Sequence, residues 1–184
     1  ALDADSKLVP CFHVGKRNGA NALTFMSKLQ ERVRMPVQIT TDAFSGYPWA
    51  IGQSYGRGTH YARINKIYQT RQPGRGRYSP PWFVTVKKQV LWGNPRESRI
   101  STSYVERQNL TMRMQMRRFT RLTNAFSKKY DNLLAALNLH FCWYNFVRVH
   151  SSLKTTPAVA AGIESRPWKI EELIPTNGHN GTIS

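Results

Sequence analysis

The sequence is short of acidic residues and of cysteine, and it lacks long hydrophobic runs. Its 184 residues include only 10 Asp and Glu against 27 Lys and Arg, which gives a formal net charge of +17. Such an excess is typical of proteins that bind polyanions, and nucleic acid is the partner that we expect. An anionic membrane surface is the alternative. It is disfavoured because the cations are spread along the chain rather than gathered in one tail or amphipathic helix.

The two cysteines, Cys11 and Cys142, belong to no Cys-x-x-Cys pair and to no Cys/His cluster, so we expect them to be reduced and structural. No apolar run approaches the about 18 residues that a membrane-spanning helix requires. Residues 1–10 lack the basic and apolar regions of a signal peptide. We therefore expect a cytoplasmic protein without membrane segments, of a length that corresponds to one domain.

One carboxylate stands in an arginine-rich stretch at residues 100–121, ISTSYVERQNLTMRMQMRRFTR. If the stretch is helical, four residues at i, i+3, i+7 and i+11 share one face: Glu106, Asn109, Arg113 and Arg117. A face of this composition favours a metal ion and phosphate groups as ligands. On spacing alone, a solvent-exposed basic helix with an incidental Glu is an equally good interpretation.

A second carboxylate, Asp42, ends a short alternating segment at residues 37–42. The alternation predicts a strand, and the following Ser-Gly-Tyr-Pro predicts the start of a helix. A carboxylate at the C-terminal tip of a buried strand lies at the edge of a sheet where ligands bind. Taken alone, Asp42 is equally compatible with a turn-forming role, because Asp is common before turns that contain glycine.

The rest of the chain alternates between strand and helix patterns. We expect strands at residues 8–14 and 60–68, helices at 20–34 and 132–150, and a short helix led by Pro157. Arg63 and Asn65 in the second of these strands should point away from its packed face, and Lys66 is a further candidate to do so. This order of elements is typical of an α/β protein with a mixed sheet.

Residues 70–99 interrupt that order, because prolines and glycines there lie among basic and aromatic residues. WFVTVKKQVLW, at 82–92, can form a strand or a hairpin arm. We interpret 70–99 as a DNA-contacting insertion in which Lys87 and Lys88 bind phosphates and aromatic residues stack on bases. The alternative is a solvated segment whose aromatic side chains cap the core.

A second basic run follows the Glu106 stretch. Its candidate phosphate contacts are Arg117, Arg118, Arg121, Lys128 and Lys129, and their binding should weaken steeply with salt. The alternative is charge that serves solubility only. Residues 175–184 are polar and are predicted to be a disordered tail.

Three stretches together resemble the catalytic core of DDE transposases of bacterial insertion sequences, within the ribonuclease H-like, integrase-core superfamily. They are TTDAFSGY at 40–47, STSYVERQNLTMRMQMRRFTRLTNAFSKK at 101–129 and YNFVRVHSSLKTTPAVAAGI at 144–163. The second stretch is the most specific, and the resemblance covers nearly all of residues 1–174. It implies a ribonuclease H-like mixed sheet flanked by helices, with the basic insertion preceding the helix that bears Glu106.

The resemblance also implies a function, namely DNA transposition by hydrolysis and strand transfer at transposon ends. Asp42 and Glu106 would be catalytic ligands of Mg²⁺ or Mn²⁺, and Asn145 and His150 would lie near them, with His150 a candidate DNA contact. The implied partner is double-stranded DNA, both transposon ends and target, bound by a homodimer or higher oligomer.

In this family the first catalytic Asp lies on the strand before the one expected at 8–14, so we expect it to be missing from the chain or lost. Asp3 and Asp5 are fallback candidates, although acids in a tight turn are usually turn formers. Two alternatives remain open. One is a catalytically inactive nucleic-acid-binding protein of the same fold, and the other is an unrelated basic structural protein in which Asp42 and Glu106 are accidental.

Overall fold

The protein is described by a computed structural model that covers residues 1–35, 37–69, 82–120, 124 and 129–174. The chain divides into two compact units, one of Ala1 with Pro10–Met112 and one of Leu2–Val9 with Arg113–Ser184. The division falls within the last turn of a single helix. None of the helices in the described ranges is long and apolar enough to cross a membrane.

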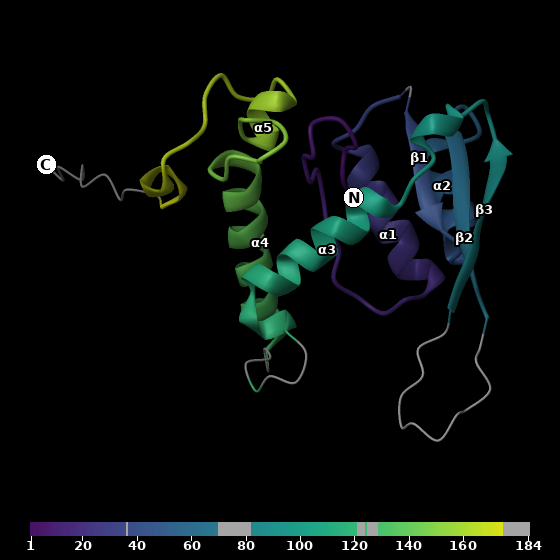
Figure 1. The fold of residues 1–184 in the computed structure, drawn as a ribbon, viewed down its shortest axis with the longest axis horizontal. Coiled ribbons are helices and arrows are strands. Elements are labelled where there is room, and N and C mark those ends of the chain that lie inside the picture. Colours follow the sequence, from purple (N-terminus) through teal and green to yellow (C-terminus); the bar gives the residue numbers. More distant parts are fainter. Residues whose placement is uncertain (36, 70–81, 121–123, 125–128, 175–184) are drawn as a thin grey trace, which may run out of the picture. The chain divides into compact units, whose positions relative to one another are not determined.

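The first unit contains a three-stranded mixed sheet and the helices that flank it. Its elements are α1 (Gly19–Gln30), β1 (Gln38–Asp42), α2 (Gly46–Tyr55), β2 (His60–Gln69), β3 (Trp82–Trp92), the short 3-10 helix η1 (Glu97–Arg99) and most of α3 (Ser103–Gln115). The strand order is β1-β2-β3, with β1 parallel and β3 antiparallel to β2 (Figure 1). The class is therefore α/β with a mixed sheet, as predicted.

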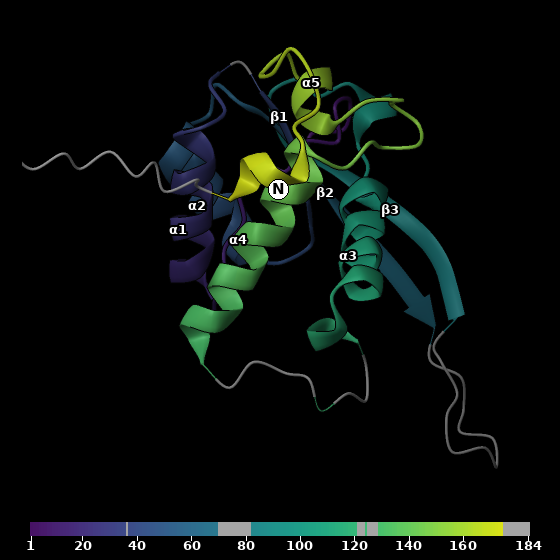
Figure 2. The same ribbon diagram turned by 90° about the vertical axis from the view of Figure 1, so that its left-hand side faces the viewer.

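Helices α1 and α2 cover one face of this sheet (Figure 2). Asn18 begins α1, because its side-chain oxygen accepts a hydrogen bond from the Asn21 N–H at 2.9 Å. The apolar side of α1 buries Met26, and that of α2 buries Ile51, against Tyr61 of the sheet. Burial of apolar surface on this scale supplies most of the stabilisation of such a unit.

The strand register defines two faces of the sheet. Thr41 and Tyr61 lie on the helix-covered face, where their hydroxyl oxygens are 2.8 Å apart. Because side chains alternate along a strand, Ala62 and Ile64 lie on the opposite face, where they pack with Ile100.

Most predicted elements of this unit are confirmed, namely both strands at 37–42 and 60–68, the helix that begins after Asp42, and a strand at 82–92. Residues 70–81 of the expected insertion lie outside the described residues. The helix predicted for 20–34 ends earlier, at Gln30. The strand predicted for 8–14 is wrong, because no described segment pairs with it in a ladder, which is what makes an alternating segment a strand.

The second unit is built around helix α4 (Tyr130–Phe146), with α5 (Pro157–Ala160) and the 3-10 helices η2 (Arg117–Phe119) and η3 (Ile170–Leu173). The predicted Pro157-led helix is confirmed, and the long helix is confirmed with an end at Phe146. Asn145 is buried and holds the segment at residues 2–9. Its side-chain oxygen accepts from Val9 N–H at 3.0 Å, and its amide nitrogen donates to Val9 C=O at 2.9 Å.

Candidate metal and nucleic-acid site

Asp42 is the last residue of β1, and its carboxylate is half exposed, at 53%. Oδ1 accepts a hydrogen bond from the Phe44 N–H at 3.1 Å, and Oδ2 accepts one from Arg17 Nη2 at 2.8 Å. The Arg17 guanidinium also lies over the Phe44 ring, 4.9 Å from its centroid. Asp42 therefore stabilises the turn that follows β1 through Oδ1, and its Oδ2 forms an ion pair with Arg17.

Glu106 lies in the first turn of α3, and both of its carboxylate oxygens accept from the Lys66 ammonium, at 2.5 and 2.6 Å. Thr102 Oγ1 donates to Oε1 at 2.9 Å. The hydrogen bond from Lys66, and after it the one from Thr102, lowers the pKa of Glu106 from its ordinary value despite some desolvation. Glu106 is therefore held as a carboxylate on the surface of β2.

The strand register shows where Asp42 lies relative to Lys66, the partner of Glu106. Asp42 is aligned with Ile64, and Lys66 follows two residues later on the same face, the opposite face. Strand geometry puts the Asp42 and Lys66 Cα atoms roughly 8 Å apart, from one strand spacing across and two residues along. Lys66 is thus a near neighbour of Asp42 in the sheet, and the side chains of Asp42 and Lys66 start from the same face.

Each acid is paired with one cation, and these ion pairs bear on whether the acids can hold a metal. Among the described residues no three His, Cys, Asp or Glu side chains gather into a metal site. Mg²⁺, however, prefers oxygen ligands and is usually held by one or two carboxylates, with waters and substrate phosphates completing its shell. Exposed ion pairs such as Asp42–Arg17 are worth about 0.2–1 kcal/mol, so a cation can be displaced at small cost. Each acid can therefore offer carboxylate oxygens to a hard divalent ion, but the described residues contain no complete set of protein ligands.

Lys87 and Lys88 lie on different faces of β3. Lys88 is aligned with Ile64, on the opposite face, and its ammonium donates to Glu97 C=O at 3.3 Å. Lys87 is aligned with Asn65, on the helix-covered face. Of the two predicted phosphate contacts, only Lys88 shares a face with Asp42 and the Lys66–Glu106 pair.

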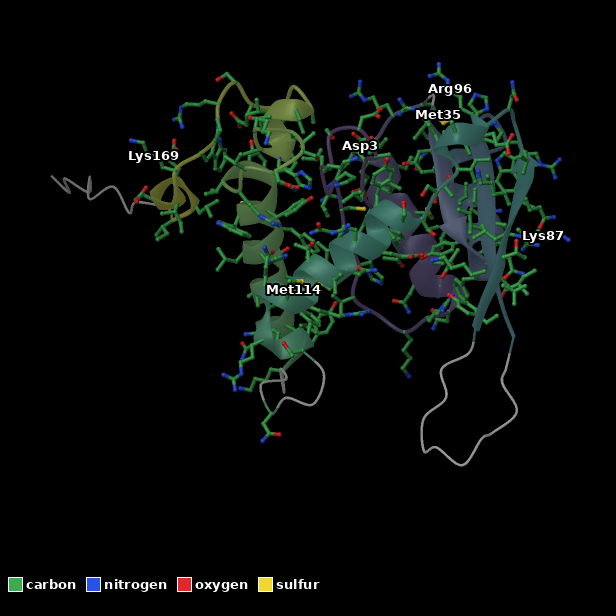
Figure 3. All side chains as sticks on the ribbon, viewed as in Figure 1. Asp3, Met35, Lys87, Arg96, Met114 and Lys169 are labelled. Carbon is green, nitrogen blue, oxygen red and sulfur yellow. The ribbon has the colours of Figure 1, made fainter. Side chains whose placement is uncertain are left out.

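The expected face of α3 is shorter than predicted. Asn109 and Arg113 are exposed on the helix, but α3 ends at Gln115, and Arg117 falls in η2 after a break at Met116. The prediction that Arg117 continues the Glu106 face is therefore wrong. Little packing favours extension of the helix, since Met114 is 78% exposed (Figure 3), and Arg113 and Arg117 at i and i+4 would repel each other.

The other predicted phosphate contacts belong to the second unit. Arg118 donates from Nη1 to Asn132 C=O at 3.2 Å, and Lys129 is exposed immediately before α4. Arg121 and Lys128 lie outside the described residues. No carboxylate in the described part of the chain pairs with Lys129, so its charge can bind a phosphate.

His150 and Asp3 both take part in local turns. The His150 N–H donates to Thr155 C=O at 2.8 Å, and its Nδ1 lies 3.0 Å from Ser152 Oγ. Burial, and then the nearby cations Arg148 and Lys7, lower the pKa of His150, which favours the neutral ring. Asp3 accepts from the Ser6 N–H at 2.8 Å, as a turn-forming acid does.

Sequence reasoning did not find the cations that accompany the acids. Arg17 and Lys66 are 25 and 40 positions from Asp42 and Glu106, so no local spacing could have linked them. No protein-family model matches the chain, and neither curated proteins nor solved structures give a match.

Proposed function

We propose that the chain is the catalytic domain of a DDE-type DNA transposase with a ribonuclease H-like fold. The observation that supports the proposal is the strand register, in which Asp42, at the carboxyl end of a parallel strand, is aligned with Ile64, two residues before the Lys66 that binds Glu106. The carboxyl ends of parallel strands are where α/β proteins bind ligands. The net charge of +17 fits a polynucleotide substrate.

The proposed reaction is hydrolysis of a phosphodiester at a transposon end, followed by attack of the freed 3′-hydroxyl on target DNA. When bound, Mg²⁺ or Mn²⁺ supplies stabilisation of the negative charge on the attacking and leaving oxygens. Asp42 and Glu106 would hold the ions. Arg17 and Lys66, which neutralise these acids in the free protein, would then be available to the phosphate oxygens of the DNA.

DNA would be held by basic and polar side chains of each of the two units. The proposed contacts are Lys87, Lys88, Asn109, Arg113, Arg117, Arg118, Arg121, Lys128, Lys129 and His150. Two DNA ends have to be brought together in transposition, so we propose that the protein acts as a dimer or higher oligomer, in the cytoplasm.

A catalytically inactive nucleic-acid-binding protein of the same fold is the second candidate. It is favoured by one observation, namely that each acid already has a cationic partner and no third acid joins them among the described residues. In such a protein the two ion pairs would serve the fold, while the basic surface would bind nucleic acid without cleaving it.

A plasmid-nicking assay separates the two candidates. The wild-type protein, Asp42→Asn and Glu106→Gln are incubated with supercoiled DNA in the presence of Mg²⁺, Mn²⁺ or a chelator, and binding is followed in parallel by gel shift. Glu97→Gln is the matched control, because Glu97 is an exposed acid of the same unit outside the proposed site.

The transposase predicts metal-dependent nicking that both site variants lose and the control keeps, with DNA binding retained by all. Binding without nicking by the wild-type protein would favour the inactive protein instead. Nicking that survives both site substitutions would exclude the proposed metal ligands.

A further inference from the structure

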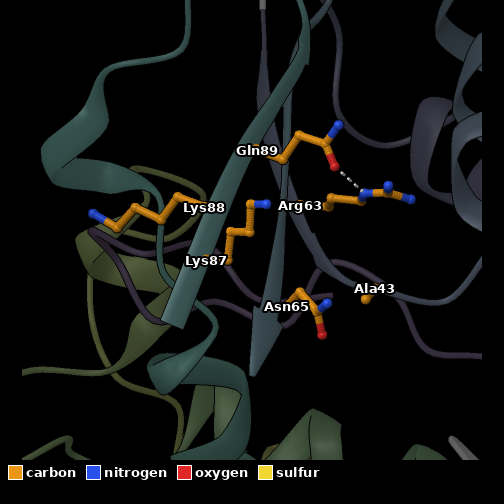
Figure 4. Close-up of a pocket in the computed structure, with 6 residues that line it drawn as sticks. All are labelled: Ala43, Arg63, Asn65, Lys87, Lys88 and Gln89. Carbon is orange, nitrogen blue, oxygen red and sulfur yellow. Dashed lines mark hydrogen bonds between the residues drawn. The ribbon is translucent and has the colours of Figure 1, made fainter. Parts of the chain in front are cut away.

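A cavity of about 420 Å³ lies on β2 and β3 (Figure 4). All of its lining belongs to the first unit: Ala43, Arg63, Asn65, Lys87, Lys88 and Gln89. The lining has three cationic residues and two amides, and no carboxylate. Its composition is therefore that of an anion site.

The strand register explains how the cavity is formed. Arg63 is aligned with Gln89 and Asn65 with Lys87, and all four start from the helix-covered face. Asn65, Lys87 and Gln89 are exposed, so α1 and α2 do not cover this part of the face. Arg63 and Lys87 are diagonal neighbours, a separation that long side chains bridge.

The side chains already have an arrangement suited to one small anion. Arg63 Nε donates to Gln89 Oε1 at 2.8 Å, which fixes the plane of the guanidinium and leaves its two terminal nitrogens to donate elsewhere. In Figure 4 the Lys87 ammonium extends toward Arg63 and Gln89, whereas Lys88 points away. No Asp or Glu in the described part of the chain pairs with Arg63 or Lys87.

We propose that Arg63, Lys87 and Asn65 bind one phosphate group of a DNA backbone. The planar fork of an arginine matches two phosphate oxygens, a lysine supplies a point charge, and an amide adds a neutral donor. Gln89 is a positioning residue that orients Arg63. That the phosphate comes from DNA rests on the proposed function; free phosphate or pyrophosphate is the other source of the same chemistry.

The site lies on the face of the sheet from which the Asp42 and Lys66 side chains do not start. A DNA phosphate held there would contact Arg63 and Lys87, which are different side chains from those that would hold the metal ions. Arg63 and Asn65 would thus join Lys87 in one phosphate contact, whereas Lys88 would act separately.

The test is a double-substitution cycle on duplex DNA binding, measured by fluorescence anisotropy at several salt concentrations. Arg63→Gln and Lys87→Gln are each expected to weaken binding about tenfold, because each removes a charged donor from one shared phosphate. The double variant should be weakened by much less than the product of the two effects, since the phosphate contact is already lost. Lys88→Gln removes the same charge from the adjacent position and should combine independently with Arg63→Gln.

Equal, independent effects of Lys87→Gln and Lys88→Gln would overturn the site, and so would unchanged binding by Arg63→Gln. A wild-type protein that binds no duplex would refute both the transposase and its inactive DNA-binding alternative, and the phosphate site is then tested with a free anion. In that case the melting temperature is measured with and without pyrophosphate. If pyrophosphate raises the melting temperature of the wild-type protein but not that of Arg63→Gln, the site binds a free anion. If it does not raise the wild-type melting temperature, the proposed site is overturned.

Discussion

Substitution of Asn145 tests whether this residue serves the fold or the chemistry. The family resemblance implied a position near the acids, but both polar atoms of the side chain are used to bind the backbone of Val9. Asn145 and Val9 are 8% and 6% exposed, so water cannot readily replace these bonds. Asn145→Ala should therefore destabilise the second unit.

The size of the effect follows from the groups left without partners. Asn145→Ala leaves one N–H and one C=O of Val9 without a hydrogen-bond partner, and each unsatisfied buried group costs about 1–3 kcal/mol. For the two groups together, the expected loss in the free energy of unfolding is roughly 2–6 kcal/mol. Asn145→Asp keeps an acceptor for the Val9 N–H but has no donor for the Val9 C=O when it is ionised, so it should be destabilised too.

Urea unfolding followed by circular dichroism measures these differences. Asn138→Ala is the matched control, because Asn138 is an exposed asparagine of the same helix and should change stability by less than about 0.5 kcal/mol. If Asn145→Ala is as stable as the control, the bonds to Val9 contribute nothing and the structural role assigned to Asn145 is refuted.

Three further predictions concern the first unit, all measured by unfolding. Because Lys66 lowers the pKa of Glu106, the stability lost in Glu106→Gln should be present at neutral pH and should shrink as the pH falls below the ordinary value of 4.5; a loss independent of pH would contradict the pairing. Ile51→Ala should cost about 2–5 kcal/mol, since Ile51 is fully buried, whereas a cost below 1 kcal/mol would remove it from the core. Gly93→Ala should cost more than Gly56→Ala, because both have positive φ but only a Cβ at Gly93 meets a backbone oxygen, at 2.9 Å; equal costs would show that this contact relaxes freely.

The sequence predicted those parts of the fold that depend on local patterns. Alternation at residues 37–42 and 60–68 predicted β1 and β2, and WFVTVKKQVLW predicted β3. Such strands can be predicted locally, because the apolar and polar residues of a strand alternate along its own sequence. Asp42 ends β1 and also accepts a hydrogen bond in the turn that follows, so it has both of the positions that the sequence suggested for it. These features needed no knowledge of distant segments.

The parts that the sequence did not predict depend on tertiary contacts. An alternating segment such as 8–14 becomes a strand only if another strand pairs with it, and Asn145 supplies side-chain bonds to Val9 instead. The end of α3 carries no Pro or Gly, so helix propensity alone would have continued it through Arg117. The ion pairs of the acids join residues that only the folded sheet brings together.

In the proposed metal site, Asp42 and Glu106 together hold divalent ions. Mn²⁺ titration of the DNA-bound protein, followed by the electron paramagnetic resonance signal of free Mn²⁺, measures this directly. We expect bound Mn²⁺ in the wild-type protein and weaker binding in both Asp42→Asn and Glu106→Gln. Binding that neither substitution alters, or that only one of them alters, would contradict it.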